Sequence, residues 1–375
     1  MEIFLTNLFI VFMSSIGARL NPTSRTLETD YKKYNKLFII IAMASLIVVS
    51  GFRYKSGTDF DTYTENYQYL NMETNAQTNT QTEENSESSS EESDVGFDIL
   101  CKMLYKISAD PQIMFLTTAL ITNVLIVLNL MKYSKRFELS MWLYITTFVY
   151  YSTFNGLRQW MAAAIIFTGT KYLLEERSFK RYLPIVLFAS LFHESALVMI
   201  PIYFFIDSNT FSKRNLLMIL GFMFAVFAYS LFLPILSRIL EGTQYAHYVQ
   251  IFETDTNGIN PLRLAVYFAP VGVVCYFHKI INPNSDIKID RLINMCIIGF
   301  LIMFMALRQV FFARLIFYFD LYYLLLIPRI IDIGDKKFRR FFYYTIAMGY
   351  FAFSYLLLRS GEAWIIPYTF KITLF

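Results

Sequence analysis

The chain alternates between long apolar runs and short polar or charged segments. The apolar runs are roughly 17–22 residues long, which is about the length that an α-helix needs to cross a ~30 Å hydrocarbon core. Such runs recur along the whole sequence. The pattern predicts an all-α, polytopic integral membrane protein that forms a single transmembrane domain over residues 1–375, with about 12 spanning or part-spanning helices.

The order of apolar runs and basic loops predicts both the helices and their direction. Loops rich in Lys and Arg are expected in the cytoplasm, which places both ends of the chain outside. The first run lacks the basic region of a signal peptide and is expected to be a spanning helix. The expected helices are Glu2–Ala18, Leu37–Phe52, Gln112–Met131, Leu139–Asn155, Gln159–Leu174, Leu216–Leu236, Pro261–Phe277, Leu292–Leu307, Val310–Leu326 and Phe341–Leu358, with a short one at Val95–Ser108.

The run Tyr182–Ile206 has the length of one spanning helix but is flanked by basic residues on both sides. A single crossing would place one basic cluster outside, against the positive-inside rule. Two short helices, Tyr182–Phe192 and Ser195–Ile206, avoid the conflict, with a turn at His193 and Glu194 and with Ser195 as the second helix's cap. The sequence leaves the single helix open as the alternative.

A polar, acidic and Ser/Thr-rich segment, residues 71–94, interrupts the apolar pattern. Neither Lys nor Arg occurs between Lys55 and Lys102. Such a composition cannot bury enough apolar area to fold. We expect a disordered extracytoplasmic loop inserted between the second and third spanning helices.

Composition agrees with a membrane protein and narrows the chemistry. The sequence is 56% hydrophobic and 18% aromatic, well above average soluble domains. Its net charge of +4 comes from loops expected in the cytoplasm, so it gives no argument for nucleic acid. The three cysteines show no metal-ligand spacing, so neither a disulfide framework nor a metal site is expected.

Charged residues also gather at helix ends that the topology places outside. The planar guanidinium fork matches phosphate oxygens, so several arginines around an outward-facing polar cavity would suit a lipid-linked pyrophosphate. The alternative is that each arginine extends to lipid headgroups or pairs with an acid. Arg314 would lie ~9 Å below Arg308 on one helix. The residues concerned are Arg53, Asp59, Asp61, Arg158, Arg263, Arg308 and Arg314.

Two of these arginines stand in matching contexts, because Leu157-Arg158-Gln159 echoes Leu307-Arg308-Gln309. This repetition favours a functional role for both. Asp59 and Asp61 alternate with aromatic residues and precede Tyr63, a pattern that suits sugar binding or proton abstraction and equally suits a solvated loop.

His193 interrupts an apolar run and lies beside Glu194. It is a candidate general base or hydrogen-bond donor, with ordinary packing as the alternative. His247 and His278 are interpreted as structural. Asp320 falls well inside an apolar run and is expected to pair with an arginine or tyrosine of a neighbouring helix.

Several segments resemble a known family. These are GTDFDTYTENY from Gly57, NGLRQWMAAAIIF from Asn155, YLPIVLFASLFHESALVMIPIYF from Tyr182 and, more loosely, LRQVFFARLIFYFDLYYLLLIP from Leu307. Together they are similar to the EpsG family of bacterial exopolysaccharide proteins, relatives of Wzy-type O-antigen and capsule polymerases. The acidic run 71–94 departs from the family pattern as an insertion.

The resemblance implies a glycosyltransferase-type polymerase at the outer face of the bacterial cytoplasmic membrane. It would join undecaprenyl-diphosphate-linked oligosaccharide units, with the polyprenyl diphosphate as leaving group and with no cofactor. Flippase and chain-length regulator proteins are candidate partners. Arg158 and Arg308 would bind the diphosphate, and His193 or else Asp59 or Asp61 would accept the proton. Further expected substrate contacts are Arg53, Asp61, Tyr63, Gln159, Glu194, Arg263, Gln309 and Arg314.

Two other classes remain open from the sequence. A lipid-linked oligosaccharide flippase fits the helix count, although transporter sites usually lie near the membrane midplane rather than at one face. A polysaccharide O-acyltransferase could use His193 as a base.

Overall fold

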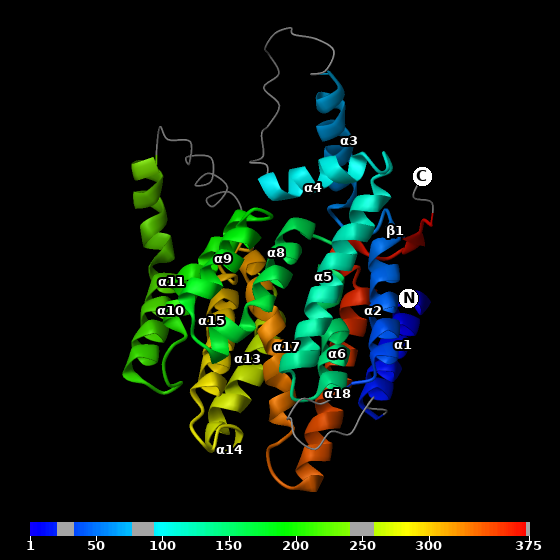
Figure 1. The fold of residues 1–375 in the computed structure, drawn as a ribbon. Helices are drawn as coiled ribbons and strands as arrows, with labels where there is room; N and C mark the ends of the chain where they lie inside the picture. Colours follow the sequence, from blue (N-terminus) through cyan, green and yellow to red (C-terminus); the bar gives the residue numbers. More distant parts are fainter. Residues whose placement is uncertain (21–33, 77–93, 241–258, 373–375) are drawn as a thin grey trace. The chain divides into compact units, whose positions relative to one another are not determined.

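The described part of the chain is mainly helical (Figure 1). The computed structural model describes residues 1–20, 34–76, 94–240 and 259–372. Contacts divide the chain into two compact units. The first comprises Met1–Tyr172, Ser178–Val198 and Phe341–Phe375, and the second comprises Leu173–Arg177 and Met199–Arg340.

The first unit is built on long helices that pack side by side. α1 (Glu2–Leu20) packs on α2 (Lys36–Gly51), and α2 packs on α5 (Gln112–Tyr133) (Figure 1). Polar side chains inside this packing find partners on neighbouring helices, as the Ser45 hydroxyl does with Asn7 Oδ1 at 2.7 Å. Such pairing is required because an unpaired polar group in an apolar interior is costly.

Short helices in the first unit begin and end at residues with special backbone conformations. Phe148, with φ 74°, separates α6 (Phe137–Thr146) from α7 (Val149–Ser152). Gly156, with φ 58°, precedes α8 (Leu157–Thr168), and glycine adopts this left-handed conformation without a steric penalty. A π-helical turn, η1 (Lys171–Glu175), follows α8 and crosses from the first unit into the second.

The segments that flank the acidic insertion form two further helices of the first unit. α3 (Phe60–Ala76) and α4 (Val95–Tyr105) pack on each other, and α4 also packs on α5. A two-residue strand before α3, β1 (Arg53–Tyr54), pairs antiparallel with β2 (Thr369–Phe370). This pairing brings the C-terminal segment back to the start of α3.

The first unit also contains α9 (Phe179–Ser190), the 3₁₀ turn η2 (Glu194–Val198) and most of α18 (Lys336–Arg359). The first residues of α18 belong to the second unit. α9 and η2 both pack on α8. Trp142 Nε1 donates to Ala347 O at 3.0 Å and thereby links α6 to α18. A 3₁₀ turn, η3 (Glu362–Trp364), leads to β2.

The second unit centres on α15 (Ile287–Met305), which contacts α11 (Lys213–Leu240), α13 (Pro261–Tyr276) and α17 (Phe317–Ile330). Its other helices are short: α10 (Met199–Phe205), α14 (His278–Ile281) and α16 (Phe312–Leu315). Asn260 and Asp286 cap α13 and α15 through side-chain oxygens that accept backbone N–H groups, as such residues do at helix starts.

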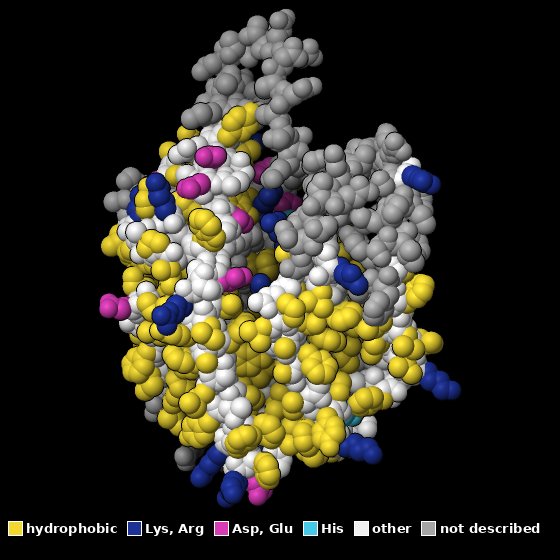
Figure 2. Space-filling view, turned by 180° about the vertical axis from the view of Figure 1, so that it is seen from behind, with side chains coloured by type: hydrophobic (Ala, Val, Ile, Leu, Met, Phe, Trp, Pro, Cys, Tyr) yellow, Lys and Arg dark blue, Asp and Glu magenta, His cyan; other side chains and the backbone are white. Residues whose placement is uncertain are grey.

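The surface has the character expected of a protein in lipid. Three described helices, α1, α5 and α18, are long and apolar enough to cross a membrane. Large hydrophobic side chains such as Phe9, Leu217 and Met348 are exposed by more than 60%. Figure 2 shows hydrophobic side chains over wide areas of the visible face. These features support an integral membrane protein, because soluble proteins rarely expose such continuous apolar area.

Most expected helices are present, with three corrections to their continuity. The run expected as one helix over Leu139–Asn155 is divided at Phe148. The run Gln159–Leu174 leaves α-geometry after Thr168. The run Val310–Leu326 starts only at Phe312 and is divided at Ile316, so the helical spacing expected between Arg308 and Arg314 does not apply.

The run Tyr182–Ile206 is divided at the expected turn. α9 ends at Ser190, and a 3₁₀ turn starts at Glu194, so the prediction of two segments is confirmed. Ser195 lies inside this turn, and its expected role as a cap is therefore wrong. The helix expected over Leu216–Leu236 is longer than predicted, because Ser237–Leu240 also belong to α11. His247 lies outside the described residues.

The segment 71–94, expected to be disordered, is ordered at both of its ends. Residues 71–76 continue α3, and Asp94 is a buried residue that precedes α4. Residues 77–93 lie outside the described part of the chain.

Candidate functional site

Arg158 lies in the first turn of α8, and the loop before this helix is fixed by Asp59. The Gly156 N–H donates to Asp59 Oδ2 at 2.8 Å, and the Thr58 hydroxyl donates to Asp59 Oδ1 at 2.7 Å. The negative charge of this carboxylate also interacts favourably with the positive N-terminal end of the α8 helix dipole. Asp59 therefore positions the turn that presents Arg158, and both of its oxygens already have partners.

The main polar cluster of the first unit is formed by Asp94, Arg158 and His193. Asp94 Oδ2 lies 3.2 Å from Arg158 Nη1 and 3.2 Å from His193 Nδ1. The Asp94 side chain is 5% exposed, whereas Arg158 and His193 are 24% and 32% exposed. One buried carboxylate thus holds a cation and an imidazole, both of which reach solvent.

The orientation of His193 follows from its bond to Asp94. A carboxylate only accepts hydrogen bonds, so Nδ1 carries the proton and donates it to Asp94. The other ring nitrogen, Nε2, then presents a lone pair, and within the described residues it forms no hydrogen bond. This arrangement is suited to proton acceptance, because the carboxylate fixes the imidazole and stabilises its charged form.

The start of α4 is held against the end of α9, and this contact places Asp94 beside His193. The Gly96 N–H donates to Leu191 O at 2.7 Å. A Cβ built on Gly96 would lie 2.8 Å from Leu191 O, so only glycine fits this approach. Asp94 itself accepts the backbone N–H groups of Phe97 and Asp98 through its carbonyl oxygen, as the residue before a helix does.

A pocket opens next to Arg158, between α3, α4 and α5. It encloses about 280 Å³ of empty space, including its open mouth. Tyr63 and Phe97 stand near the guanidinium, and the Tyr63 ring centroid lies 6.0 Å from Arg158 Cζ. Burial raises the pKa of Tyr63, an effect that the charge of Arg158 opposes. The lining is formed by Tyr63, Asn66, Tyr67, Leu70, Phe97, Asp98, Cys101, Met114 and Arg158.

The structure places the other residues expected at the site of the first unit in varied surroundings. Gln159 is buried and donates to Ser195 Oγ at 3.3 Å, which links α8 to η2. Asp61 and Glu194 are exposed at the starts of α3 and η2.

Arg53 is only 1% exposed and is enclosed by protein. Its guanidinium donates to Phe154 O at 2.9 Å and lies 4.8 Å and 5.0 Å from the ring centroids of Phe115 and Phe154. Burial lowers its pKa to about 10. These contacts give Arg53 a structural position between α2, α5 and the loop before α8.

The remaining expected residues lie in the second unit. Arg308 and Arg314 are exposed in and after the loop that follows α15, Gln309 is 1% exposed, and Arg263 lies in the first turn of α13. Asp320 Oδ1 accepts the Tyr267 hydroxyl at 2.8 Å, so the expected pairing with a neighbouring helix is confirmed.

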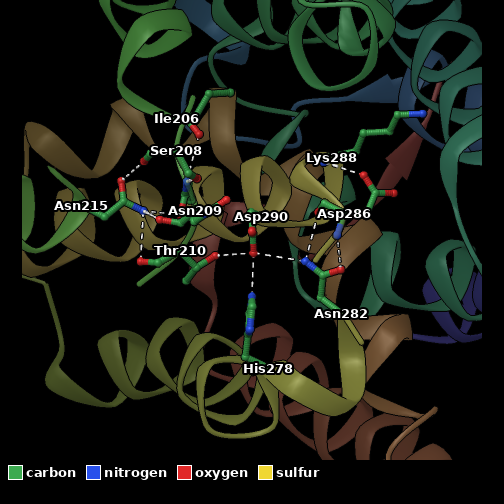
Figure 3. Close-up of polar contacts among 11 residues, drawn as sticks. Ile206, Ser208, Asn209, Thr210, Asn215, His278, Asn282, Asp286, Lys288 and Asp290 are labelled. Atoms are coloured by element: carbon green, nitrogen blue, oxygen red, sulfur yellow. Dashed lines mark hydrogen bonds and ion pairs between the residues drawn. The ribbon is translucent and has the colours of Figure 1, made fainter. Parts of the chain in front are cut away.

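A second aspartate–histidine pair lies in the second unit (Figure 3). Asp290 Oδ1 accepts from His278 Nε2 at 2.6 Å, from Thr210 Oγ1 at 2.9 Å and from Asn282 Nδ2 at 3.3 Å. Asp290 is 2% exposed. Figure 3 shows these three side chains converging on one oxygen from separate segments, which ties the segments together.

Nearby in the same unit, Asp207 pairs with two arginines. Arg177 Nη2 lies 3.2 Å from Asp207 Oδ2, and Arg291 Nη2 lies 2.9 Å from Asp207 Oδ1. Arg291 also donates to Leu174 O at 2.8 Å, and the Arg177 guanidinium lies 3.7 Å from the Tyr203 ring centroid. The cluster joins η1 to the chain around α10 and α15. Among the described residues, no group of three or more His, Cys, Asp or Glu side chains could hold a metal ion.

Sequence reasoning missed Asp94 and the helix α3. By composition Asp94 falls in the acidic insertion, although an aspartate directly before the apolar spacing of α4 is a recognised helix-start signal. α3 has buried aromatic residues at Phe60, Tyr63 and Tyr67, and this i, i+3, i+7 spacing predicts an amphipathic helix. Both signals were present in the sequence.

Comparison with known proteins identifies the family. Curated proteins and solved structures gave no match. The model of the EpsG family matches residues 36–370, which include the three residues of the Asp94 cluster and the segment around Arg308. Because this match covers nearly the whole chain, the protein belongs to the EpsG family, a family of Wzy-like polymerases.

Proposed function

We propose that this protein is a membrane polymerase that joins oligosaccharide repeat units carried on undecaprenyl diphosphate at the outer face of the bacterial cytoplasmic membrane. The observation that carries the proposal is the Asp94 cluster, in which one buried carboxylate presents a partly exposed guanidinium and a partly exposed imidazole. An anion-binding group beside a proton acceptor is what transfer from a diphosphate leaving group requires. Membership of the EpsG family agrees with this chemistry.

In the proposed reaction, a hydroxyl of the acceptor sugar attacks the anomeric carbon of the donor. A bond forms between that carbon and the acceptor oxygen, and the bond from the carbon to the phosphate oxygen breaks. The electron pair leaves with undecaprenyl diphosphate, and the acceptor proton passes to His193 Nε2. Charge therefore grows on the leaving phosphate and on the imidazole at the same time.

Each residue of the cluster has one role in this step. Arg158 binds the diphosphate and offsets the charge that develops as it leaves, because a guanidinium pairs with phosphate oxygens in two-point geometry. Asp94 keeps His193 in the tautomer with a free Nε2 and stabilises the imidazolium that forms. When the diphosphate binds Arg158, it balances part of the positive charge that otherwise pairs with Asp94.

His193 suits the role of base better than Asp59. Asp59 accepts two short hydrogen bonds from Gly156 and Thr58, which leave its oxygens occupied. Its role is to hold the loop before α8. For Arg308 in the second unit, we propose phosphate binding on the basis of its exposure and its sequence context shared with Arg158.

The test is reconstitution of the purified protein in liposomes with the lipid-linked repeat unit that accumulates in cells lacking it. A ladder of longer glycans on undecaprenyl diphosphate is the expected result. Unchanged glycan moved across the bilayer would indicate a flippase, and added acyl groups would indicate an acyltransferase. Either of these outcomes without a ladder overturns the proposal.

Arg158→Ala should lower the polymerisation rate by about 10²–10³-fold, the typical cost of removing one group that stabilises transition-state charge. Arg214→Ala is a matched control, because Arg214 is exposed and bonds to backbone carbonyls in the second unit. Full polymer length with Arg158→Ala would remove the diphosphate role from this residue.

A further inference from the structure

The pocket between α3 and α4 contains polar groups that the transfer step does not use. Asn66 is exposed at its lining, and Asp98 is half-buried. The rest of the lining is aromatic and apolar, with Arg158 as its single cation among the described residues. The pocket and the Asp94 cluster therefore share the Arg158 guanidinium.

The walls of the pocket are built from side chains whose polar ends are occupied or suppressed. The Tyr67 hydroxyl donates to Ser108 O at 2.8 Å, so its ring faces the space as an apolar wall. Burial raises the pKa of the Cys101 thiol to about 12, so this residue is a neutral wall rather than a nucleophile. Tyr63 and Phe97 complete the aromatic lining, with ring centroids 5.9 Å apart.

This combination matches the surface of a sugar ring. A pyranose has apolar C–H faces, which pack on aromatic rings whose faces carry negative partial charge. Its hydroxyl groups both donate and accept, as the Asn66 amide does, and the Asp98 carboxylate accepts from hydroxyl donors. Few polar groups placed on an aromatic wall are the usual means of fixing a small ligand's orientation.

Charge sets the direction in which a ligand would lie. A diphosphate is attracted to Arg158 and repelled by Asp98, so its phosphates belong at the Arg158 end. The sugar attached to the diphosphate then extends toward Asn66 and Asp98. The empty space of about 280 Å³ includes the open mouth of the pocket, so the pocket has room for at most one sugar residue and not for a whole repeat unit.

We infer that the pocket lined by Tyr63, Asn66 and Asp98 is a subsite for the sugar residue bonded directly to the donor's diphosphate. The inference rests on the proposed function, because it takes the ligand of Arg158 to be a diphosphate. Asn66 and Asp98 are then specificity residues that contact sugar hydroxyls, and the α3–α4 pair selects the donor.

The experiment compares two probes on the full-length protein in nanodiscs: undecaprenyl diphosphate, and the same lipid bearing the repeat unit from cells that lack this protein. The wild type should bind the glycosylated lipid at least about tenfold more tightly than the bare lipid. This ratio corresponds to the binding free energy of one or two hydrogen bonds to charged or polar groups. The double variant Asn66→Ala with Asp98→Asn should reduce this ratio to about one. Its affinity for the bare lipid should not fall, because the loss of the Asp98 charge only lessens the repulsion of the diphosphate, and this retained binding also shows that the variant is folded.

The matched control replaces Glu65 and Gln68, which are exposed on α3 and absent from the pocket lining. Glu65→Gln with Gln68→Ala should retain the wild-type ratio. A ratio that survives in the Asn66 and Asp98 variant would place sugar recognition elsewhere and overturn the inference.

The two proposals fail in different ways. If the wild type binds both lipids equally and Arg158→Ala abolishes binding of both, the sugar subsite is wrong and the diphosphate role stands. If neither lipid binds in an Arg158-dependent way, the proposed function is wrong and the subsite falls with it.

Discussion

The two units each contain an aspartate that holds a histidine, and the two pairs differ in what surrounds them. Asp290 accepts three side-chain donors on one oxygen and is 2% exposed, and its histidine is 16% exposed. Asp94 holds one imidazole and one guanidinium, both about a quarter to a third exposed, beside a pocket. We call the buried pair of Asp290 and His278 the closed pair, and the partly exposed pair of Asp94 and His193, with Arg158 beside it, the open pair.

The difference teaches how to distinguish a structural pair from a functional one. In the closed pair, every hydrogen bond joins segments of the protein, so the benefit of the pair is stability. In the open pair, the buried carboxylate has two partners that are both partly exposed, so a ligand can reach them. Sequence alone does not separate the two cases, because both histidines interrupt or follow apolar runs.

The largest expected effect comes from exchanging the two histidines for amides that keep the bond to aspartate. His193→Asn retains a donor at the Nδ1 position and removes the Nε2 base, so the polymerisation rate should fall by about 10²–10⁴-fold. His278→Gln retains a donor at the Nε2 position and should leave the rate per folded protein unchanged. Glycan ladders from reconstituted liposomes measure both. Equal losses in the two variants would erase the distinction between an open and a closed pair.

The second largest effect is on stability. Asp290→Ala leaves three donors without their acceptor, and two of them, Thr210 and Asn282, are buried, so the free energy of unfolding should fall by about 3–5 kcal/mol. Asp94→Ala should cost about 1 kcal/mol, because the partners of Asp94 can turn to water. Unfolding in detergent followed by circular dichroism measures both values. A larger loss with Asp94→Ala would mean that the open cluster is chiefly structural.

Much of the fold could be predicted because the membrane environment leaves strong signals. Runs such as Gln112–Met131 must satisfy their backbone groups internally, so apolar length alone identifies them as helices. The helix divisions were harder. The break at Phe148 depends on a left-handed residue with a bulky side chain, and the sequence carries no local signal for it.

The candidate site could be predicted only in part. Arg158 and His193 stood out because a charge in an apolar run is costly. Their connection through Asp94 depends on α4 packing against the end of α9, a contact between residues about a hundred positions apart. By composition Asp94 belongs to an acidic run, but its contacts with Arg158 and His193 make it a buried part of the fold. The pairing of β1 with β2 was missed for the same reason, because two-residue strands have no periodicity to detect.

A moderate effect is expected where α4 meets α9. Gly96→Ala places a methyl group 2.8 Å from the Leu191 carbonyl oxygen, so the start of α4 must move away. Such overpacking costs about 1–3 kcal/mol, and displacement of Asp94 should lower the polymerisation rate by roughly tenfold. Gly349→Ala is the control, because a Cβ there meets nothing within 4 Å and alanine favours a helix. A neutral Gly96→Ala would show that the position of Asp94 is not set by this contact.

The smallest effect tests whether Asp59 positions Arg158 or takes part in the transfer. Asp59→Asn keeps an oxygen that can accept the Gly156 N–H, so the loop before α8 should stay in place, with a loss of at most about 1 kcal/mol in the free energy of unfolding. The polymerisation rate should fall less than about threefold, because no proton passes through this side chain. Asp59→Ala removes the acceptor, and its larger loss should appear in the binding of undecaprenyl diphosphate, since the turn that presents Arg158 loosens. If Asp59→Asn instead lost activity as completely as His193→Asn while it still bound the lipid, Asp59 would be the base and the open pair would serve only to bind the diphosphate.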